Sequence, residues 1–382
     1  MTTPRAHVDD RSLGYVPALD GLRAIAVAGV VMFHTALHWL PGGFLGVSTF
    51  FTLSGFLITS VLLGELRTTA TVDLGQFWAR RLRRLAPASL VVIAFAVLVS
   101  HTAITGWGDG FLRTDAWAGV GQVMNWHVAY WIPDSDIFRG IGPIGPYWSL
   151  AVEEQFYAAI ALVFLAVRHR RDSRRWLVGI FVAGWVVALV SAVLMHSTIP
   201  REMFSTHIRV AELAAGCLLA LGVERWGRPV SGALTNALAV GGLIVTLAVF
   251  LVTRETQTWV LSGGFALLSV LHVATIVGLL ADGPAARVLS TRPMLWLGTR
   301  SYGIYLVHWP IIRIMRSDRM HLSGIPLATV QIAVSLIVAE ALYRFVETPI
   351  RRRSSLTPRA TALGWLAGSA AVALLALTLR AG

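Results

Sequence analysis

Apolar stretches of roughly 20 residues recur along nearly the whole chain, and short polar segments rich in arginine separate them. An α-helix of about 20 residues is long enough to cross the hydrocarbon core of a bilayer. We therefore predict an all-α polytopic membrane protein, a bundle of about 10–11 transmembrane helices. The expected spans are 18–38, 44–64, 85–104, 147–167, 176–195, 207–223, 232–252, 259–281, 295–315, 325–345 and 360–380.

Composition supports this prediction. Hydrophobic residues make up 55% and charged residues 14% of the 382 positions, whereas soluble domains carry about 25% charged residues. No polar block exceeds roughly 40 residues, so we predict a single membrane domain. The one cysteine, Cys217, lies in an apolar stretch, which excludes a disulfide framework. Residues 1–17 are polar and lack the short apolar core of a signal peptide.

The distribution of arginine predicts the topology. The net charge is +12, and every basic residue apart from histidine is arginine. A nucleic-acid-binding protein can be equally basic, but these arginines gather in alternate loops, as the positive-inside rule describes. We therefore expect these loops and the N-terminus on the cytoplasmic side. The loops are 65–84, 168–175, 224–231 and 346–359.

Two segments fall on the outer side of this topology. The longest connection, 105–146, contains several Trp, Gly and Pro residues and is predicted as an ordered, partly interfacial loop. The second is a short loop in which Arg316 and Arg319 flank Asp318. This short loop departs from the positive-inside pattern.

Ionisable residues within predicted spans are candidate functional residues, because burying them in a bilayer is costly. In the first span, Arg23 and His34 are 11 residues apart and share a helix face, roughly 16 Å apart along the axis. Asp20, roughly 21 Å from His34, is placed to orient Arg23 across one turn. The plainer alternatives are a surface ion pair for Asp20 and Arg23 and a packed side chain for His34.

His34 and His38 have the i, i+4 spacing of a metal pair. Neither an HExxH motif nor a nearby carboxylate completes a site, so we predict no metal. In the second span, Ser54 and Gly55 are small residues that allow helices to approach closely. Ser54 lacks the context of a nucleophilic serine.

Two further groups carry more charge than topology requires. Arg80, Arg81 and Arg84 can share one face of a helical turn and suit bidentate phosphate contacts. The alternative explanation is that these arginines set the topology and contact anionic lipid head groups. Glu153 and Glu154 are adjacent carboxylates that could divide acid and base roles or pair with an arginine of another span.

Later spans add two more candidates. Arg209 and Glu212 have the i, i+3 spacing of an intrahelical ion pair. His308 lies inside the ninth span, in the stretch that runs from Tyr302 to Pro310.

Together these stretches resemble the membrane acyltransferase-3 family, which includes O-antigen and other glycan acetyltransferases and macrolide acyltransferases. The resemblance covers about Tyr15 to Arg352. Its motifs, in chain order, are Arg23-x10-His34, Ser54-Gly-Phe-Leu-Ile-Thr59, Arg80-Arg81-x-x-Arg84, Trp148-Ser149-Leu-x-x-Glu153-Glu154-Gln-Phe-Tyr157, Tyr305-x-x-His308 and Glu347-x-Pro349-x-Arg351. One departure is Ser48, where family members often carry Asp.

The resemblance implies a membrane acyltransferase domain over 18–352, with 353–382 as an additional transmembrane helix. It implies an acyl-CoA donor, acetyl-CoA first, bound by Arg23, Arg80, Arg81 and Arg84. The hydroxyl acceptor would be a glycan, glycolipid or macrolide-type product. The protein would be integral to the bacterial cytoplasmic membrane. His34 would act as general base, with Glu153 or Glu154 orienting it or protonating the leaving thiolate.

The same resemblance implies supporting roles for other residues of these motifs. Substrate contacts would come from Trp148, Ser149, Tyr157, Tyr305 and His308. Asp20, Ser54, Arg209 and Glu212 would orient neighbouring groups. A transporter or flippase for a lipid-linked sugar is the main alternative, because it would also hold Arg, Glu and His inside spans. A non-catalytic membrane scaffold is a further alternative, although it would not need so many buried ionisable groups.

Overall fold

The computed structural model describes residues 14–35, 37, 39–100, 109–132, 141–195, 199–353 and 355–379. Every regular element in these ranges is a helix. The long helices are α1 Pro17–His34, α2 Gly46–Thr69, α3 Leu74–Ser100, α7 Tyr147–Val167, α8 Ser173–Leu194, α10 Thr206–Trp226, α11 Ala233–Val252, α12 Phe265–Leu280, α14 Arg292–Ile314, α16 Gly324–Leu342 and α18 Pro358–Ala376. The short ones are η1 Gly43–Leu45, α4 Asp109–Val120, α5 Met124–Tyr130, α9 Ile199–Phe204, η3 Val260–Gly264, α13 Pro284–Leu289, α15 Ser317–Met320, η4 Tyr343–Glu347 and α17 Thr348–Arg351.

The structure confirms the prediction of an all-α polytopic membrane protein. Ten helical segments in the described residues are long and apolar enough to cross a membrane. The remaining long helix, α14, coincides with the ninth predicted span but carries Arg292, Arg300 and Arg313. Arg300 forms an ion pair with Glu340 of α16, so one of these charges is compensated inside the bundle.

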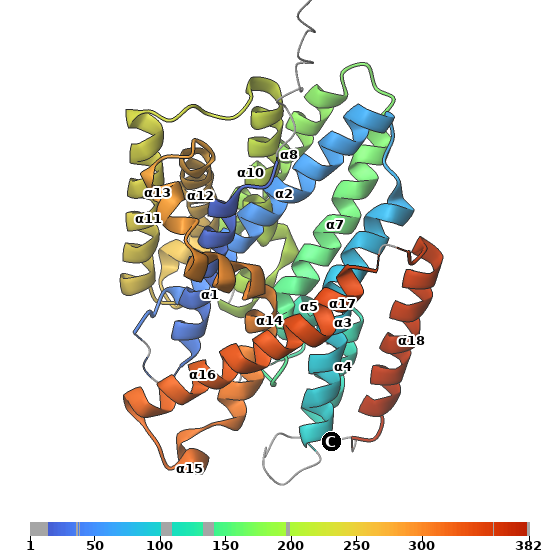
Figure 1. Cartoon of the computed structure of the whole chain (residues 1–382), viewed down its shortest axis with the longest axis vertical. Coiled ribbons are helices and arrows are strands. Elements are labelled where there is room, and N and C mark those ends of the chain that lie inside the picture. The colour runs from blue at the N-terminus through green and yellow to red at the C-terminus, as the bar shows by residue number, and fades with distance from the viewer. Residues whose placement is uncertain are drawn as a thin grey trace, which may run out of the picture.

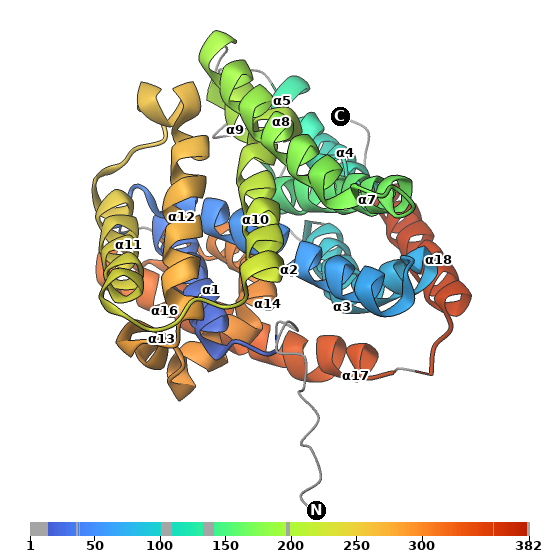
Figure 2. The same cartoon turned by 90° about the horizontal axis from the view of Figure 1, so that it is seen from above.

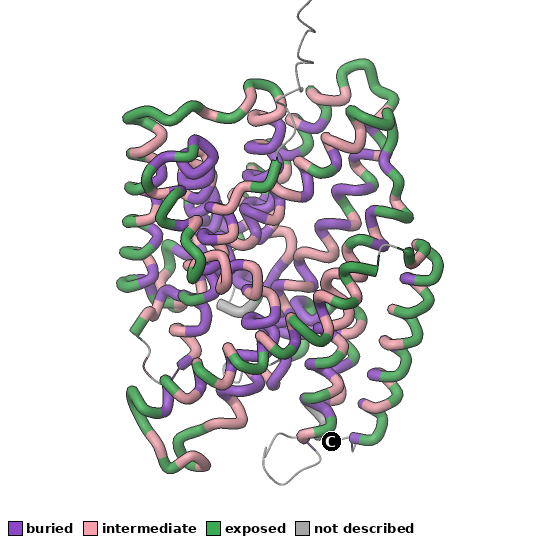
Figure 3. Tube along the Cα trace, viewed as in Figure 1, coloured by how far each residue is buried: buried purple, intermediate pink, exposed green. Residues whose placement is uncertain are grey.

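Close contacts between glycines and neighbouring backbones build the centre of the bundle, where α2 crosses α10 (Figure 2). A Cβ atom on Gly55 would lie 2.0 Å from the carbonyl oxygen of Leu213, and one on Gly216 would lie 2.1 Å from that of Thr52. Only glycine fits at such distances, which agrees with the predicted packing role of Gly55. Buried positions gather in this centre, whereas exposed positions follow the outer helices (Figure 3).

Two predicted loops are wholly or partly helical. The predicted 65–84 loop contains only a short turn, because α2 continues to Thr69 and α3 begins at Leu74. The carboxylate of Asp73 accepts a hydrogen bond of 2.9 Å from the backbone N–H of Gln76 and so caps α3. The arginines at 80, 81 and 84 therefore lie on a helix. In the 105–146 connection, the described residues form α4 and α5.

The bundle has two ends, which we call the N-terminal face and the opposite face. Residues 14–16 and the connections 70–73, 168–172 and 227–232 lie at the N-terminal face (Figure 1). The α1–α2 connection and α15 lie at the opposite face. Because α1 begins at the N-terminal face, Arg23 lies nearer that face and His34 lies near the opposite one.

Candidate functional site

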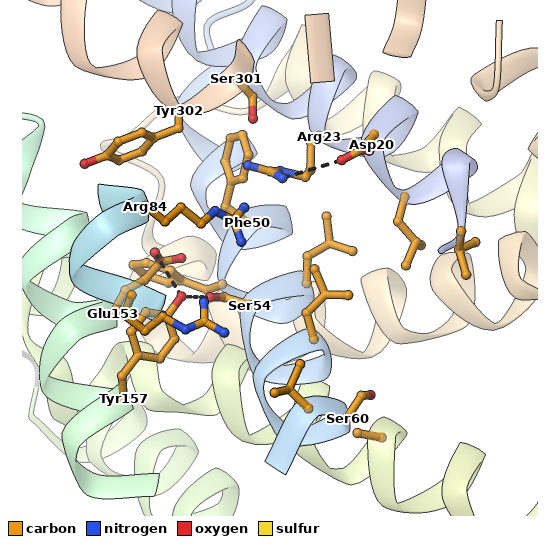
Figure 4. A pocket seen from close by; sticks show the side chains of 18 of the residues that line it. Asp20, Arg23, Phe50, Ser54, Ser60, Arg84, Glu153, Tyr157, Ser301 and Tyr302 are labelled. Atoms are coloured by element: carbon orange, nitrogen blue, oxygen red, sulfur yellow. Dashed lines mark hydrogen bonds and ion pairs between the residues drawn. The ribbon is translucent and has the colours of Figure 1, made fainter. Parts of the chain in front are cut away.

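A cavity of about 590 Å³ opens among α1, α2, α3, α7, α10 and α14. Its rim includes Tyr15 and Arg67, which are exposed at the N-terminal face, and it extends inward to Ser149 and Tyr305. Its volume lies within the range of about 300–1,000 Å³ typical of small-molecule sites. Figure 4 shows its polar lining, in which side chains from α1, α2, α3, α7 and α14 point toward one space.

Four arginines line this cavity: Arg67 at its rim, and Arg23, Arg81 and Arg84. Arg23 Nη1 lies 3.5 Å from Asp20 Oδ1, which is the contact that the spacing predicts. Arg81 lies over the ring of Tyr157, 4.9 Å from its centroid. The positions of Arg81 and Arg84, one turn apart on α3, bring both into the cavity.

Arg80 lies differently from the other two arginines of its motif. Its Nη2 atom forms an ion pair of 3.0 Å with Glu65, and its side chain is 45% exposed. One residue corresponds to about 100° of rotation on a helix, which turns Arg80 away from Arg81. Arg80 is not among the residues that line the cavity, although the sequence grouped it with Arg81 and Arg84, which do.

Of the two adjacent carboxylates, Glu153 lines the cavity. Tyr157, one turn later on α7, donates a hydrogen bond of 3.4 Å from its hydroxyl to Glu153 Oε2. The same hydroxyl is hydrogen-bonded to the hydroxyl of Ser54 on α2. Ser54, Tyr157 and Glu153 therefore form a continuous polar chain along one wall of the cavity (Figure 4).

Ser149 and Tyr305 form the deep end of the cavity. Their hydroxyl oxygens are 2.7 Å apart, and the Tyr305 hydroxyl donates to the carbonyl oxygen of Pro146 at 2.9 Å. The Tyr305 ring lies 5.5 Å from that of His308, measured between centroids. One aromatic contact thus connects the cavity with the histidine at the far end of α14.

His34 contacts His308 at the opposite end of α1. His34 Nδ1 lies 2.9 Å from the carbonyl oxygen of Val30, which can only accept, so we assign the proton to Nδ1. His308 Nδ1 likewise donates to the carbonyl oxygen of Tyr305 at 2.6 Å, which leaves its Nε2 as an acceptor, 3.2 Å from His34 Nδ1. This arrangement puts the lone pair of neutral His34 on Nε2.

The predicted pairing of His34 with Glu153 or Glu154 differs from this arrangement. Glu153 shares its cavity with Arg23, whereas His34 lies roughly 16 Å from Arg23 along α1 and contacts His308 instead. Sequence reasoning placed His308 among the substrate contacts and missed it as the partner of His34. The signal was the Tyr-x-x-His motif, but no local pattern indicates which helix it faces.

A second buried group surrounds Arg209. Its Nε atom lies 2.9 Å from Glu212 Oε2, which agrees with the predicted intrahelical ion pair. Its Nη2 atom donates to the hydroxyl of Ser48 at 3.3 Å. Three aromatic rings enclose the guanidinium group, those of Phe51, Trp148 and Phe265.

Two of the site residues predicted from the sequence, Glu212 and Trp148, belong to the group around Arg209. Glu212 supplies a carboxylate beside Ser48, the position at which family members often carry Asp. Trp148, predicted to contact substrate, packs over Arg209 and against Phe204, whose ring centroid lies 4.9 Å from its own.

In the described part of the chain, no three potential metal ligands come together. His38 lies outside the described residues. The absence of a metal therefore stays a prediction.

Comparison with known proteins gives the family. The family described as an acyltransferase domain matches residues 16–344. The O-acetyltransferase OatA of Staphylococcus aureus (strain NCTC 8325 / PS 47) is 36% identical over 358 residues, which cover 89% of this chain and 58% of that protein. The peptidoglycan O-acetyltransferase OatA of Listeria monocytogenes is 38% identical over 366 residues, covering 88% of this chain and 56% of that protein.

The chain thus spans somewhat more than half the length of these curated relatives. No solved structure gives a significant match. The family match covers most of the predicted spans, all of the motifs before Glu347, and the whole cavity apart from Gly14 and Tyr15. The chain belongs to the acyltransferase-3 family.

Proposed function

We propose that the protein is a membrane O-acyltransferase that moves an acyl group, acetyl in the first instance, from acyl-CoA to a hydroxyl of a sugar-containing acceptor. One observation carries this proposal. Four arginines, among them Arg23 of α1, line a cavity open at one face, and His34 at the other end of α1 contacts His308. This arrangement suits a long anionic donor that is bound at its phosphates and reacts at its distant thioester.

The donor is proposed to enter from the cytoplasm. The arginine-rich connections lie at the N-terminal face, which the positive-inside rule assigns to the cytoplasmic side of the plasma membrane. The phosphates of coenzyme A would contact Arg23, Arg81 and Arg84. The pantetheine arm is comparable in length with the roughly 16 Å between Arg23 and His34. The thioester would then lie beyond Tyr305, near His34.

His34 is the proposed general base. Its Nε2 atom takes the proton of the acceptor hydroxyl, and the oxygen attacks the thioester carbonyl carbon. A C–O bond forms, the C–S bond breaks, and the thiolate leaves with the electron pair. The imidazolium of His34 returns that proton to the sulfur. His308 holds the reactive tautomer by accepting from Nδ1–H, 3.2 Å away.

The acceptor is proposed to be a hydroxyl of a cell-envelope glycan. The names of the two relatives, an O-acetyltransferase and a peptidoglycan O-acetyltransferase, support a glycan over a macrolide-type product. Glycolipids carry the same hydroxyl chemistry and remain in the proposed acceptor class.

Acyl transfer in reconstituted vesicles tests the proposal. Purified protein receives labelled acetyl-CoA with and without envelope glycan, and both free thiol and acetylated glycan are measured. We expect thiol release that requires the glycan and matches the acetate transferred. Transport of a lipid-linked sugar without thiol release would establish the transporter alternative instead.

A further inference from the structure

The segment 142–146, which leads into α7, holds two aromatic side chains of α14. The indole Nε1–H of Trp309 donates to the carbonyl oxygen of Gly142 at 2.9 Å. One turn earlier on α14, the hydroxyl of Tyr305 donates to the carbonyl oxygen of Pro146, also at 2.9 Å. Two side chains four residues apart on one helix are therefore hydrogen-bonded to the same short segment. These two bonds oppose rotation of α14 about its axis.

Each of these two aromatic rings contacts one histidine of the pair. The ring centroid of Trp309 lies 4.8 Å from that of His34. The ring centroid of Tyr305 lies 5.5 Å from that of His308, which directly precedes Trp309 on α14. A rotation of α14 would move both rings and would change the 3.2 Å contact between His308 Nε2 and His34 Nδ1. The orientation of the histidine pair therefore depends on the bonds that hold the two rings.

The segment that accepts these bonds is itself firmly held. The carbonyl oxygen of Gly142 also accepts from the backbone N–H of Gly145 at 3.0 Å, which closes a tight turn with Pro143 at its second position. A Cβ atom at position 142 would collide with the carboxylate of Asp115, so the turn lies directly against α4. Ile144, inside the turn, is fully buried. The acceptor for the Trp309 indole is therefore fixed by local geometry and by packing.

We propose that Trp309 is a positioning residue for proton transfer. Its bond to Gly142 fixes the indole ring, and the ring holds the imidazole of His34 with Nδ1 toward His308 and Nε2 pointing away from it. This inference rests on the proposed acyl transfer and adds the residue that orients its base. Trp309 is not among the residues that line the arginine-lined cavity, so donor binding does not require it.

Steady-state kinetics of Trp309→Phe test the inference. Phenylalanine keeps an aromatic ring beside His34 but lacks the N–H group that donates to Gly142. We expect kcat per folded protein to fall about tenfold with the donor KM unchanged, because the base loses its orientation while the cavity stays intact. An unchanged kcat, or a rise in donor KM alone, would overturn the proposal.

Trp185→Phe is the matched control. The indole Nε1–H of Trp185 on α8 donates to Ser269 Oγ of α12 at 3.0 Å, so this variant loses the same kind of bond between two helices. Neither of these helices contributes to the lining of the cavity. We expect a similar loss of thermal stability in both variants and a fall in kcat only in Trp309→Phe. Equal falls in kcat would reduce the effect to a general loosening of the bundle and overturn the proposal.

A spectroscopic measurement separates this inference from the proposed function. Solid-state NMR of histidine rings enriched in a nitrogen isotope shows which ring nitrogen carries the proton, and the difference spectrum against His34→Gln assigns the His34 signals. At a pH above the histidine titration range, we expect one His34 tautomer, protonated on Nδ1, in the wild type and in Trp185→Phe. Trp309→Phe should contain both tautomers, because its ring no longer fixes the imidazole.

The outcomes of the NMR measurement do not depend on activity. A single His34 tautomer in Trp309→Phe, the same as in the wild type, would overturn the inference even if acetyl transfer proceeds. Mixed tautomers in Trp309→Phe, together with wild-type protein that transfers no acetyl group, would uphold the positioning of His34 while rejecting the proposed function.

Discussion

The two ends of α1 hold different kinds of site. Near its start, Arg23 borders a large cavity lined by further guanidinium groups and by the Ser54–Tyr157–Glu153 chain. At its end, His34 lies among aromatic rings, with the Trp309 centroid 4.8 Å from its own, and contacts a second histidine. The first end suits binding of phosphates, and the second suits transfer of one proton. Binding and chemistry can therefore occupy opposite ends of one helix.

The largest effect is expected at the histidine end. His34→Ala should lose at least about a hundredfold in acetyl transfer while the protein still folds, because a general base contributes about 10²–10⁴ in rate. His38→Ala, outside the described residues, should lose much less. The measurement is transfer from acetyl-CoA in vesicles, with folded protein quantified in parallel. Near-normal turnover by well-folded His34→Ala would remove the catalytic role from this end of α1.

The partner histidine should have the next largest effect. His308→Leu removes the second acceptor of His34 Nδ1–H, beside the carbonyl oxygen of Val30, and should lower kcat roughly tenfold, with the donor KM unchanged, because only the proton-transfer step is affected. His308→Gln, which can still accept, should recover part of the rate. Steady-state kinetics at varied donor concentration give the two constants. A rise in donor KM without a fall in kcat would place His308 in donor binding instead.

A smaller effect is expected at the cavity end. Arg81→Gln should raise the apparent donor KM by about tenfold, more at low salt than at high salt, because a phosphate contact is screened by ions. Arg80→Gln is the matched control, since Arg80 pairs with Glu65. Donor titrations at two ionic strengths measure both variants. Equal effects of the two substitutions would indicate that the arginines of this motif only set the membrane topology.

The smallest effect concerns Asp115, whose carboxyl is buried on α4, outside the predicted spans. Burial raises the pKa of Asp115 above its usual 3.8, and the hydrogen bond from His127, 3.0 Å away, opposes that rise. The folded protein therefore binds a proton more readily than the unfolded chain does. Stability should fall as the pH rises from about 4 through the raised pKa.

Asp115→Asn should flatten this pH dependence. The change in Tm is expected to be about 2 °C or less, since one group contributes little in a chain of this size. Thermal unfolding in detergent across pH 4–8 measures it. Asp115 packs against Gly142, whose carbonyl oxygen accepts from Trp309 Nε1 at 2.9 Å, so the variant also tests support for the ring beside His34. A steeper pH dependence in the variant than in the wild type would contradict a raised pKa for the Asp115 carboxyl.

The sequence by itself determined the architecture and the candidate residues on single helices. In a bilayer a helix satisfies all its backbone hydrogen bonds internally, so apolar length alone identifies the spans. The shared face of Arg23 and His34 and the contact between Asp20 and Arg23 follow from helix periodicity. Such relations depend only on residues near one another in the chain, and a sequence displays these directly.

Only the tertiary structure decided how the helices face one another. His34 and His308 meet although 274 positions separate them. Glu153 lines the cavity, and Arg81 reaches it whereas Arg80 turns toward Glu65. These outcomes depend on helix rotations fixed by close packing at crossings such as that of Gly55 with Leu213. Each rotation is the joint result of many contacts between segments that are far apart in the chain. No single stretch of the sequence displays all of these contacts.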